Sequence, residues 1–365
     1  MSSEDRAAED DPGAEDDDPV SGDEVVAGSR DETGLGVHLP VAAQPSLDDL
    51  VGIGVRAEEL GYDRAWLPET WGRDAVTTLA LLAERTDRIG VGSSLFNVYS
   101  RSPALLGQTA ATLQEASGGR FRVGLGPSGP AVVERWHGVD FDRPLRRTRE
   151  AVEIVRQVLA GDTVTYDGDG FDLDGFRLRC DPPEPPPPID VGGMGPTAVE
   201  LAGRFADGWH ALMLSPDGLR DRATDLARGA ELGGRSVDDV HVTLVLPAAV
   251  SEGDGGERAR ELVTRHVAFY TGGMGTFYRD ALVQQGYDAA GRAHEAWQAG
   301  DRDRAVDLVG AFVDDLGVWG TADAARASLD RFRAVDVVDE VAVAFPRAAT
   351  ADDVAATLSA LAPRS

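Results

Sequence analysis

Residues 60–129 read LGYDRAWLPETWGRDAVTTLALLAERTDRIGVGSSLFNVYSRSPALLGQTAATLQEASGGRFRVGLGPSG and carry the strongest signal of the fold. Short apolar runs at 64–67, 89–95 and 121–125 alternate with amphipathic segments that are long enough for helices. Each run ends in small or polar residues. This repeated strand–helix rhythm predicts a parallel sheet. In such folds the residues that follow each strand carry the chemistry, so a functional site is expected there.

The same rhythm continues along the chain from Gly34. Strands are predicted near residues 35–39, 63–68, 88–95, 120–126, 189–193, 207–213, 241–248 and 339–345. Helices are predicted near residues 46–60, 74–86, 103–117, 144–160, 195–206, 217–231, 256–271 and 321–333. Because the strands and helices alternate so regularly, the pattern favours an α/β fold, a (β/α)8 TIM barrel, over an open sheet.

Two insertions interrupt this rhythm. Residues 163–188 contain an alternating pattern with Gly-Asp turns, which predicts a hairpin, and then a proline-rich run. Residues 272–316 lie between the seventh and eighth strands and contain extra helical segments such as 301–315. Long insertions after barrel strands often form lids or substrate pockets, so substrate specificity is expected to depend on them.

The charge of the chain is extreme, with 63 acidic and 35 basic residues and a net charge of −28. Every basic residue is arginine, because the sequence contains no lysine. This pattern is typical of a halophilic protein that stays soluble in concentrated salt, where screening is strong. The alternative explanation is a GC-rich genome, which accounts for the missing lysine but not for the size of the net charge. Nucleic acid and anionic membranes are excluded as partners, since this charge would repel both.

The composition also bounds the domains and the location of the protein. Residues 1–33 are rich in Asp, Glu, Ser and Gly, which predicts a disordered acidic tail, and residues 34–365 are expected to form a single barrel domain. No apolar run reaches the roughly 18 residues of a membrane span, and the acidic N-terminus is unlike a secretory signal. A cytoplasmic protein is therefore expected. No HExxH or CxxC pattern occurs, so no metal site is predicted.

Two glycine-rich strand ends are candidate binding motifs. In the first, residues 117–129, the glycines that include Gly126 would let a flat ligand or a phosphate approach the backbone. The second, IDVGGMGP at 189–196, runs from a strand into a helix, where free N–H groups bind phosphate. Its candidate residues are Gly192, Gly193, Met194 and Gly195. For both motifs a tight turn without a ligand is the alternative.

Together these segments resemble the bacterial luciferase-like monooxygenase superfamily, whose members are flavin- or deazaflavin-dependent barrels. The resemblance covers about residues 34–347 and rests on LGYDRAWLPE, LALLAERTDRIGVG, RSPALLGQTAATLQEASGGRFRVGLG and VELAGRFADGW, in this order. Within it, WLPETWGRDAVTTLALLA followed by SSLFNVYSRSPA is most similar to the methylenetetrahydromethanopterin reductase branch. That branch uses the deazaflavin coenzyme F420. The resemblance therefore implies coenzyme F420, with FMN as the alternative, a small-molecule substrate and a homodimer.

The resemblance also implies how the ring is held. The third strand would end in a bulge with a non-prolyl cis peptide that supports one face of the ring. In this sequence the bulge falls on 92–97, with Ser94–Leu95 as the expected cis bond and Ser93 in the same cofactor-binding segment. Asn97 would hydrogen-bond the edge of the ring or the substrate. Its alternative role is that of a turn residue.

The phosphate site would be completed, by family position, by residues after the sixth strand. These are Met213, Leu214 and Ser215. Without lysine, any charge partner of the phosphate must be an arginine, and both Arg101 and Arg347 are candidates.

Two titratable residues are candidate catalytic groups. Glu69 ends the second strand where relatives keep His or Asp, and it would act as a proton donor; its alternative role is a charge at a helix N-terminus. His38 ends the first strand, where the reductase branch tends to have Glu, and would pair with Glu69 across the barrel mouth. A structural histidine is the alternative.

The resemblance implies hydride transfer between carbon C5 of the deazaflavin and a small organic substrate. That substrate would be a pterin one-carbon carrier, an imine or an activated alkene. Two alternatives remain open from the sequence. One is an FMN-dependent monooxygenase on the same barrel, and the other is a non-catalytic homologue that kept only the fold.

Overall fold

The computed structural model describes residues 33–41, 44 and 46–364. Except for Thr33, the acidic tail expected at residues 1–33 lies outside the described residues. From Thr33 onward the described residues belong to one structural unit.

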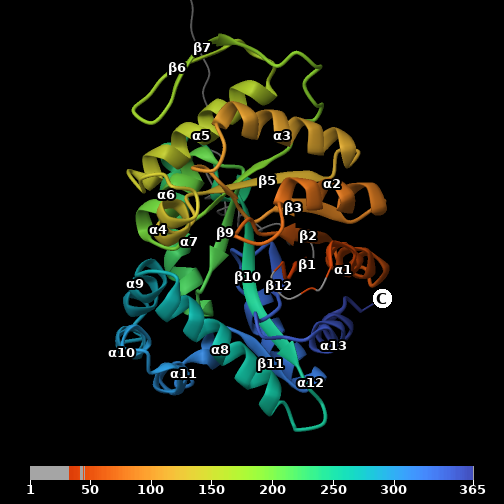
Figure 1. Ribbon diagram of the computed structural model, residues 1–365, viewed down its shortest axis with the longest axis vertical. Coiled ribbons are helices and arrows are strands. Elements are labelled where there is room, and N and C mark those ends of the chain that lie inside the picture. Colours follow the sequence, from red (N-terminus) through yellow and green to blue (C-terminus); the bar gives the residue numbers. More distant parts are fainter. Residues whose placement is uncertain (1–32, 42–43, 45, 365) are drawn as a thin grey trace, which may run out of the picture. The chain divides into compact units, whose positions relative to one another are not determined.

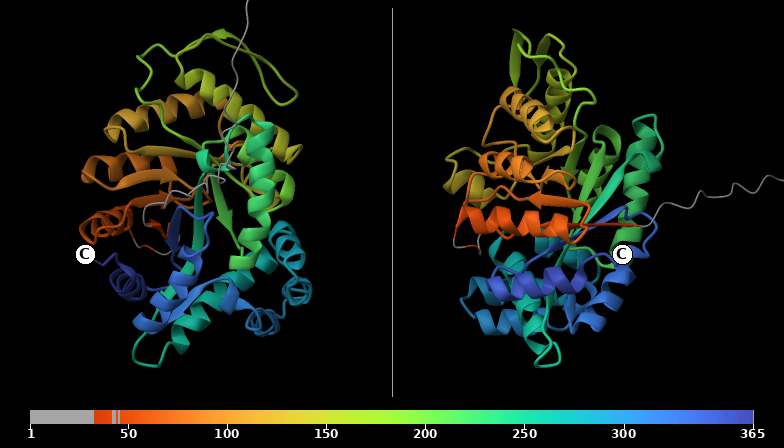
Figure 2. Two further views of the ribbon diagram at one scale, coloured as in Figure 1. Left: turned by 180° about the vertical axis from the view of Figure 1, so that it is seen from behind. Right: turned by 90° about the vertical axis from the view of Figure 1, so that its right-hand side faces the viewer.

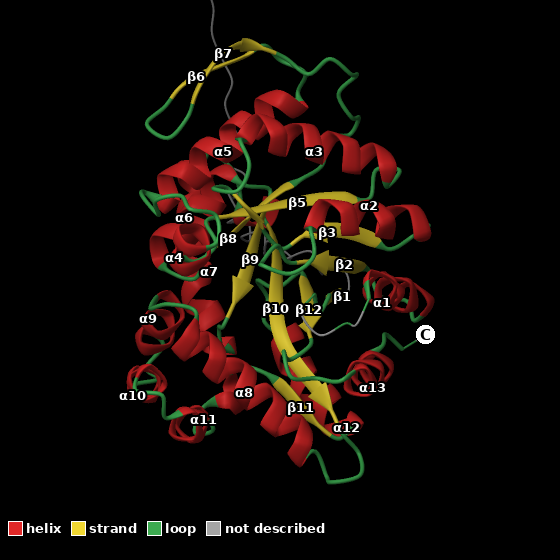
Figure 3. Cartoon of the chain, viewed as in Figure 1, coloured by secondary structure: helices red, strands yellow, loops and turns green. Residues whose placement is uncertain are grey.

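Among the described residues, eight parallel strands form a closed barrel (Figures 1 and 3). In order around the barrel they are β1 (Gly34–His38), β2 (Arg64–Leu67), β3 (Gly90–Ser93), β5 (Phe121–Gly126), β8 (Ile189–Gly192), β9 (Gly208–Leu212), β10 (His241–Val250) and β12 (Glu340–Ala344). β12 pairs with β10 on one side and with β1 on the other, which closes the ring. The predicted (β/α)8 barrel is confirmed, and each strand matches a predicted one to within two residues.

Helices surround the strands in all views (Figures 1 and 2). They are α1 (Leu47–Glu59), α2 (Ala75–Arg85), α3 (Pro103–Ala116), α5 (Pro144–Leu159), α6 (Pro196–Phe205), α7 (Pro216–Leu232), α8 (Glu257–Gly273), α12 (Ala322–Arg333) and α13 (Ala351–Leu361). All were predicted except α13, which follows β12 and completes the eighth strand–helix unit. None of the helices in the described part combines the length and the apolar character that a membrane span requires.

Both insertions are structured as the sequence indicates. The first forms the antiparallel hairpin of β6 (Val164–Asp167) and β7 (Asp172–Phe176), which lies beyond α5 from the barrel (Figure 2). The second forms α9 (Phe277–Gln284), α10 (Ala289–Gln298) and α11 (Arg302–Val309). The remaining short elements are β4 (Phe96–Asn97), α4 (Pro130–Arg135), η1 (Val237–Asp239), η2 (Val313–Asp315) and β11 (Val318–Gly320).

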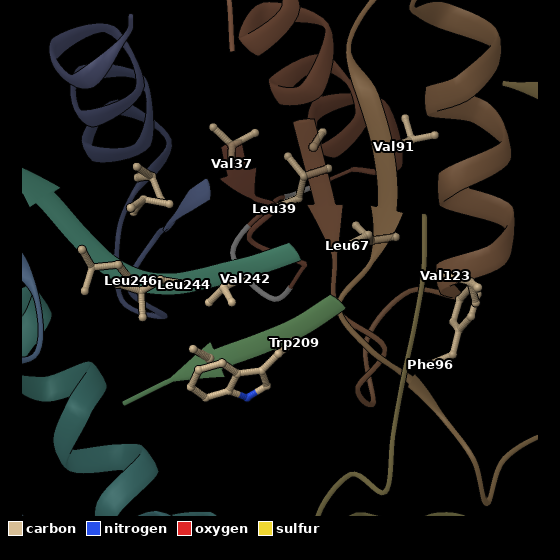
Figure 4. Packing of buried hydrophobic residues seen from close by; sticks show 14 of the residues in the cluster. Val37, Leu39, Leu67, Val91, Phe96, Val123, Trp209, Val242, Leu244 and Leu246 are labelled. Carbon is tan, nitrogen blue, oxygen red and sulfur yellow. The ribbon is translucent and has the colours of Figure 1, made fainter. Parts of the chain in front are cut away.

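Alternate residues of each strand face the helices or the barrel interior, since successive side chains of a strand point to opposite faces. The helix-facing residues are large and apolar and form the main core with the helices. Figure 4 shows several of them, among them Val37, Val91, Val123, Trp209 and Leu244. The inward positions instead carry a set of charged and polar side chains, namely Arg64, Arg122, Asp190, His210 and Glu340.

Glycines in the strands make room for these large inward side chains. A Cβ atom on Gly36 would lie 2.3 Å from a carboxylate oxygen of Glu340, and one on Gly92 would lie 2.3 Å from the Trp66 ring. Glycine is the residue that permits such close approach. The glycine content of the strands therefore follows from the polar interior.

Candidate active site at the barrel mouth

A cavity of about 1060 Å³ opens where the barrel strands end. Residues that follow β1, β2, β3, β8, β9 and β12 contribute to its wall. Aromatic side chains of α8 and α9 close one side, namely Phe269, Tyr270, Phe277 and Tyr278. Ligand pockets typically measure roughly 300–1,000 Å³, so this cavity has room for a large cofactor together with a small substrate.

The bulge after β3 forms part of the cavity wall, and its Ser94–Leu95 peptide bond is cis, as the resemblance implies. The side chain of Leu95 packs onto three strand glycines. A Cβ atom on Gly124, Gly126 or Gly192 would lie 2.7, 2.6 or 2.2 Å from a methyl carbon of Leu95. Gly124 and Gly126 therefore accommodate Leu95, and Gly126 is not part of the cavity wall. The expectation that Gly126 binds the cofactor is corrected accordingly.

Ser93 also differs from its expected role. It is fully buried and lies outside the cavity wall. Its hydroxyl donates to the Gly124 carbonyl at 3.0 Å and accepts from the Gly124 N–H at 2.9 Å. Ser93 thus joins β3 to β5 and is not placed to touch a ligand in the cavity.

The second glycine motif does reach the cavity. Gly192, Gly193, Met194 and Gly195 all belong to its wall. Helix α6 begins at Pro196. Its N-cap residue is Gly195, so no side chain caps the N-terminus of this helix. The first N–H groups of a helix have no intrahelical partner and carry a partial positive charge. This end of the cavity therefore fits a phosphate group.

Only part of the segment after β9 belongs to the cavity wall. Met213 lines the cavity and has a left-handed backbone, with φ of 57°. Leu214 and Ser215 lie outside the wall. The Ser215 hydroxyl caps α7 by accepting from Gly218 N–H at 3.0 Å, and the Ser215 N–H donates to Gln285 at 3.0 Å. Because Gln285 covers this segment, Leu214 and Ser215 are not available to a phosphate in the cavity, which corrects their expected role.

Glu69 lies at the cavity wall, but its carboxylate is fully engaged. It forms an ion pair with Arg101 and accepts hydrogen bonds from the Asn97 N–H at 3.0 Å and the Ser100 hydroxyl at 3.2 Å. These partners do not support the expected role of Glu69 as a proton donor, and Glu69 instead anchors the residues after the bulge. Arg101 also bonds Asp74, at 3.1 Å, and is no longer a candidate for the phosphate.

Asn97 is buried and lies outside the cavity wall. Its side-chain oxygen accepts from the Tyr99 N–H at 2.9 Å, which closes a tight turn. The geometry thus matches the turn residue and does not support the contact with the ring or the substrate that was expected.

His38 lines the cavity, and its Nε2 atom lies 3.4 Å from the Ser94 carbonyl oxygen. The expected pairing with Glu69 is wrong, since both Glu69 oxygens have other partners. Burial lowers the pKa of His38 to about 4, although the contact with the Ser94 carbonyl opposes this shift. His38 is therefore neutral at physiological pH.

This burial predicts a loss of stability in mild acid. The folded-state pKa of His38 lies below the ordinary value of 6.5, so the stability it contributes is complete above pH 6.5 and is lost as the pH falls toward 4. At pH 5 this group is expected to lower the free energy of unfolding by about 2 kcal/mol relative to pH 7.5. Urea unfolding at both pH values measures the difference.

The substitution His38→Gln tests the assignment, because glutamine does not titrate. The difference between pH 7.5 and pH 5 is expected to shrink by about 2 kcal/mol in the variant. A contribution from His266 remains, since burial also lowers the pKa of that residue, to about 3. An unchanged pH dependence in the variant would contradict the buried neutral state of His38.

The structure adds site residues that sequence reasoning missed. His210 lines the cavity, Asp190 lies beneath it, and Arg122 pairs with Asp190. The signal was present as a charged residue or histidine at alternate positions of otherwise apolar strands, in FRVGLG, IDVG and GWHAL. In a barrel such positions face the interior.

In parallel barrels the cavity at the strand ends is the usual place for a ligand, and an uncapped helix N-terminus there suits a phosphate group. Residues 29–338 match the profile of the family described as Luciferase-like monooxygenase, and the chain belongs to this family.

Individual relatives agree with this assignment. One is a Mycobacterium tuberculosis protein whose name assigns it provisionally to the coenzyme F420-dependent oxidoreductases; it is 32% identical over 79% of this chain and 88% of its own length. Another is the 5,10-methylenetetrahydromethanopterin reductase of Methanolobus tindarius, 29% identical over 78% of this chain and 87% of its own. The coenzyme F420-dependent tetrahydromethanopterin reductase of Methanopyrus kandleri shares the fold, with a TM-score of 0.76, 23% identity and coverage of 91% and 98%. The expected family and the oxidoreductase class are confirmed.

Proposed function

We propose that this chain is an oxidoreductase that binds coenzyme F420 in the barrel cavity and transfers a hydride between the deazaflavin and a small organic substrate. One observation carries the proposal: the Ser94–Leu95 bulge and the uncapped N-terminus of α6 lie on the wall of the same cavity. The relatives that have coenzyme F420 in their names support the choice of cofactor.

The residues present fit such a cofactor. Leu95, held by its glycine neighbours, offers an apolar surface to one face of a ring, and the N–H groups at Met194 and Gly195 suit a phosphate. When bound, the deazaflavin would supply hydride transfer at its ring carbon C5. The chain itself would bind and orient the cofactor, and the aromatic wall from α8 and α9 would exclude water from the reacting atoms.

Arg347 is the cationic candidate that remains for an anionic group of a ligand. Its guanidinium lies over Phe269, with its central carbon 4.0 Å from the ring centroid, and it lines the cavity. In the described part of the chain, no carboxylate is paired with it. β12 and β8 lie on different sides of the barrel, so Arg347 is placed away from the α6 N-terminus. A substrate group therefore suits it better than the cofactor phosphate.

The substrate is proposed to be a carrier of a one-carbon group on a pterin, as in the name of the Methanolobus relative. The insertion at 272–316 contributes Phe277, Tyr278 and Ala281 to the cavity wall. These side chains provide aromatic surface next to the place proposed for the ring, which suits a flat heterocycle.

A titration of the purified protein with coenzyme F420, and separately with FMN, tests the cofactor. Binding of F420 at micromolar concentration, followed by fluorescence quenching in concentrated KCl, is expected, with FMN at least about tenfold weaker. Tight binding of FMN without F420 binding would instead support the monooxygenase alternative. Binding of neither would support a non-catalytic homologue.

The phosphate site proposed at the N-terminus of α6 can be tested by removing one backbone N–H group. Gly195 has φ of −83°, which proline can adopt, so Gly195→Pro deletes this donor without adding charge. We expect F420 affinity to fall about tenfold, the effect of one lost charge-assisted hydrogen bond. Gly195→Ala is the matched control, because its Cβ would meet no atom within 4 Å and the N–H remains. Equal F420 affinities of the two variants would argue against a phosphate site at the N-terminus of α6.

A further inference from the structure

Three polar side chains form a chain that leads from the cavity into the barrel interior. The Ser94 hydroxyl lies 3.2 Å from Nδ1 of His210, and Nε2 of His210 lies 3.4 Å from a carboxylate oxygen of Asp190. Ser94 and His210 belong to the cavity wall, whereas Asp190 is only 1% exposed and lies beneath it. None of the binding roles assigned above uses this connection.

The direction of the hydrogen bonds follows from the state of Asp190. Burial alone would raise its pKa, but the charge of the Arg122 guanidinium and its two hydrogen bonds outweigh burial and hold the pKa of Asp190 well below its usual range. Asp190 is thus a carboxylate, which only accepts hydrogen bonds. A proton on Nε2 of His210, 3.4 Å from this carboxylate, would face an acceptor, and Nδ1 would then accept from the Ser94 hydroxyl.

The surroundings hold the His210 ring in this orientation. The ring meets Trp66 edge to face, with centroids 4.4 Å apart and an interplanar angle of 89°. The charged and titratable groups nearest to it are Asp190 from β8, Arg122 from β5 and His38 from β1. His38 contacts the Ser94 carbonyl and leaves the hydroxyl to His210.

With this tautomer the hydrogen of the Ser94 hydroxyl is directed at His210, and Ser94 itself lines the cavity. We propose that Ser94, His210 and Asp190 form a proton relay for the substrate, and that the oxidised or reduced group of the substrate is a hydroxyl or an amine that donates to Ser94. This inference rests on the proposed function, which supplies the hydride acceptor.

The step balances as follows. The O–H or N–H bond of the substrate breaks and its proton forms a bond to Oγ of Ser94. The original Ser94 proton moves to Nδ1 of His210, which becomes an imidazolium beside the Asp190 carboxylate. The electron pair of the broken O–H or N–H bond forms a new bond between that oxygen or nitrogen and the carbon, while a hydride leaves the carbon for the acceptor that the proposed function supplies. The substrate is thus oxidised by two electrons and loses two hydrogens in all. In the direction of reduction each proton moves back.

His38 is the competing group for this role. Its pKa of about 4 makes it a weak base at physiological pH, and general bases work best when their pKa is near the working pH. Within the described residues, the His38 ring contacts the Ser94 carbonyl but no side chain that would take a proton further into the protein. The chain through His210 has both an entry in the cavity and a buried carboxylate at its end.

Histidine NMR of the protein without cofactor tests the relay directly. With ¹⁵N-labelled histidine, long-range ¹H–¹⁵N spectra report which ring nitrogen carries the proton, and His210→Gln identifies the His210 signals. We expect a proton on Nε2 and a hydrogen-bonded Nδ1. Ser94→Ala is expected to move the Nδ1 resonance toward that of a nitrogen without a hydrogen bond. Ser93→Ala is the matched control, because that hydroxyl bonds only the Gly124 backbone.

A proton on Nδ1, or an Nδ1 resonance that does not respond to Ser94→Ala, overturns the relay. Neither result depends on the cofactor, so failure of the F420 titration remains a separate outcome that overturns the proposed function. In the loaded enzyme, Ser94→Ala is expected to lower kcat by about 100-fold, the typical effect of a lost proton-transfer group, and to remove the acid limb of the pH profile of kcat. An unchanged pH profile would also overturn the relay.

Discussion

Replacement of Asp190 by alanine is expected to lower the free energy of unfolding by about 3–5 kcal/mol, the usual cost of removing one partner from a buried ion pair. Asp190 binds the Arg122 guanidinium through two hydrogen bonds, at 3.0 Å and 2.5 Å. The side chains of Arg122 and Asp190 are 14% and 1% exposed. The substitution leaves the guanidinium buried without a carboxylate and removes the partner of His210 as well.

Chemical denaturation monitored by circular dichroism measures this effect. The matched control is Asp217→Ala, because Asp217 pairs with Arg220 but is 93% exposed, and its loss is expected to cost no more than about 1 kcal/mol. The double variant Asp190→Leu with Arg122→Met should recover part of the loss, since it leaves no charge unpaired. If Asp190→Ala and Asp217→Ala destabilise equally, the inward charges do not hold the barrel together as described.

The second large effect is expected from Gly124→Ala. A Cβ atom there would lie 2.2 Å from the Ser93 carbonyl oxygen and 2.7 Å from a Leu95 methyl carbon. Because the first neighbour is backbone, the strain cannot be relieved by a rotamer change and must move the bulge. We expect a loss of about 1–3 kcal/mol in stability, as for other overpacked sites. Since the displaced bulge carries the platform proposed for the ring, F420 affinity should fall at least about tenfold.

Gly52→Ala is the control for this substitution. Gly52 lies within α1, and a Cβ atom there would meet no atom within 4 Å. Alanine is favoured over glycine inside a helix by up to about 1 kcal/mol, so this variant should be slightly more stable and bind F420 as the wild type does. If Gly124→Ala matched Gly52→Ala in both stability and F420 affinity, the bulge would not require the absence of a side chain at residue 124.

The barrel was predictable because its signal is local and repeated. Apolar runs of strand length, each bounded by small residues, recur along the chain, and all eight barrel strands were found from them. Helix α13 was missed because no strand follows it, although Thr350 and Asp353 form a capping box at its start. Homodimer formation, the halophilic character and the cytoplasmic location stay predictions.

The site was predictable only where it is built from contiguous residues. The cis bond at Ser94–Leu95 and the cavity position of Gly192–Gly195 were expected correctly, since each depends on a short segment. The partners of Glu69 and Ser215 could not be predicted, because Arg101 and Gln285 come from other segments. A motif shows which hydrogen-bonding and charged groups a residue has, but the three-dimensional fold determines the partner of each group.

The inward charges also determine how the strands align. Arg64 on β2 lies 3.6 Å from Glu340 on β12, and Trp66 donates to the same carboxylate at 2.5 Å. If a strand slipped by one residue, its inward side chains would turn toward the helices, which would place a charge in the apolar core. Apolar inward residues would impose no such penalty. The polar interior therefore selects one stagger of the barrel among those that backbone pairing alone would allow.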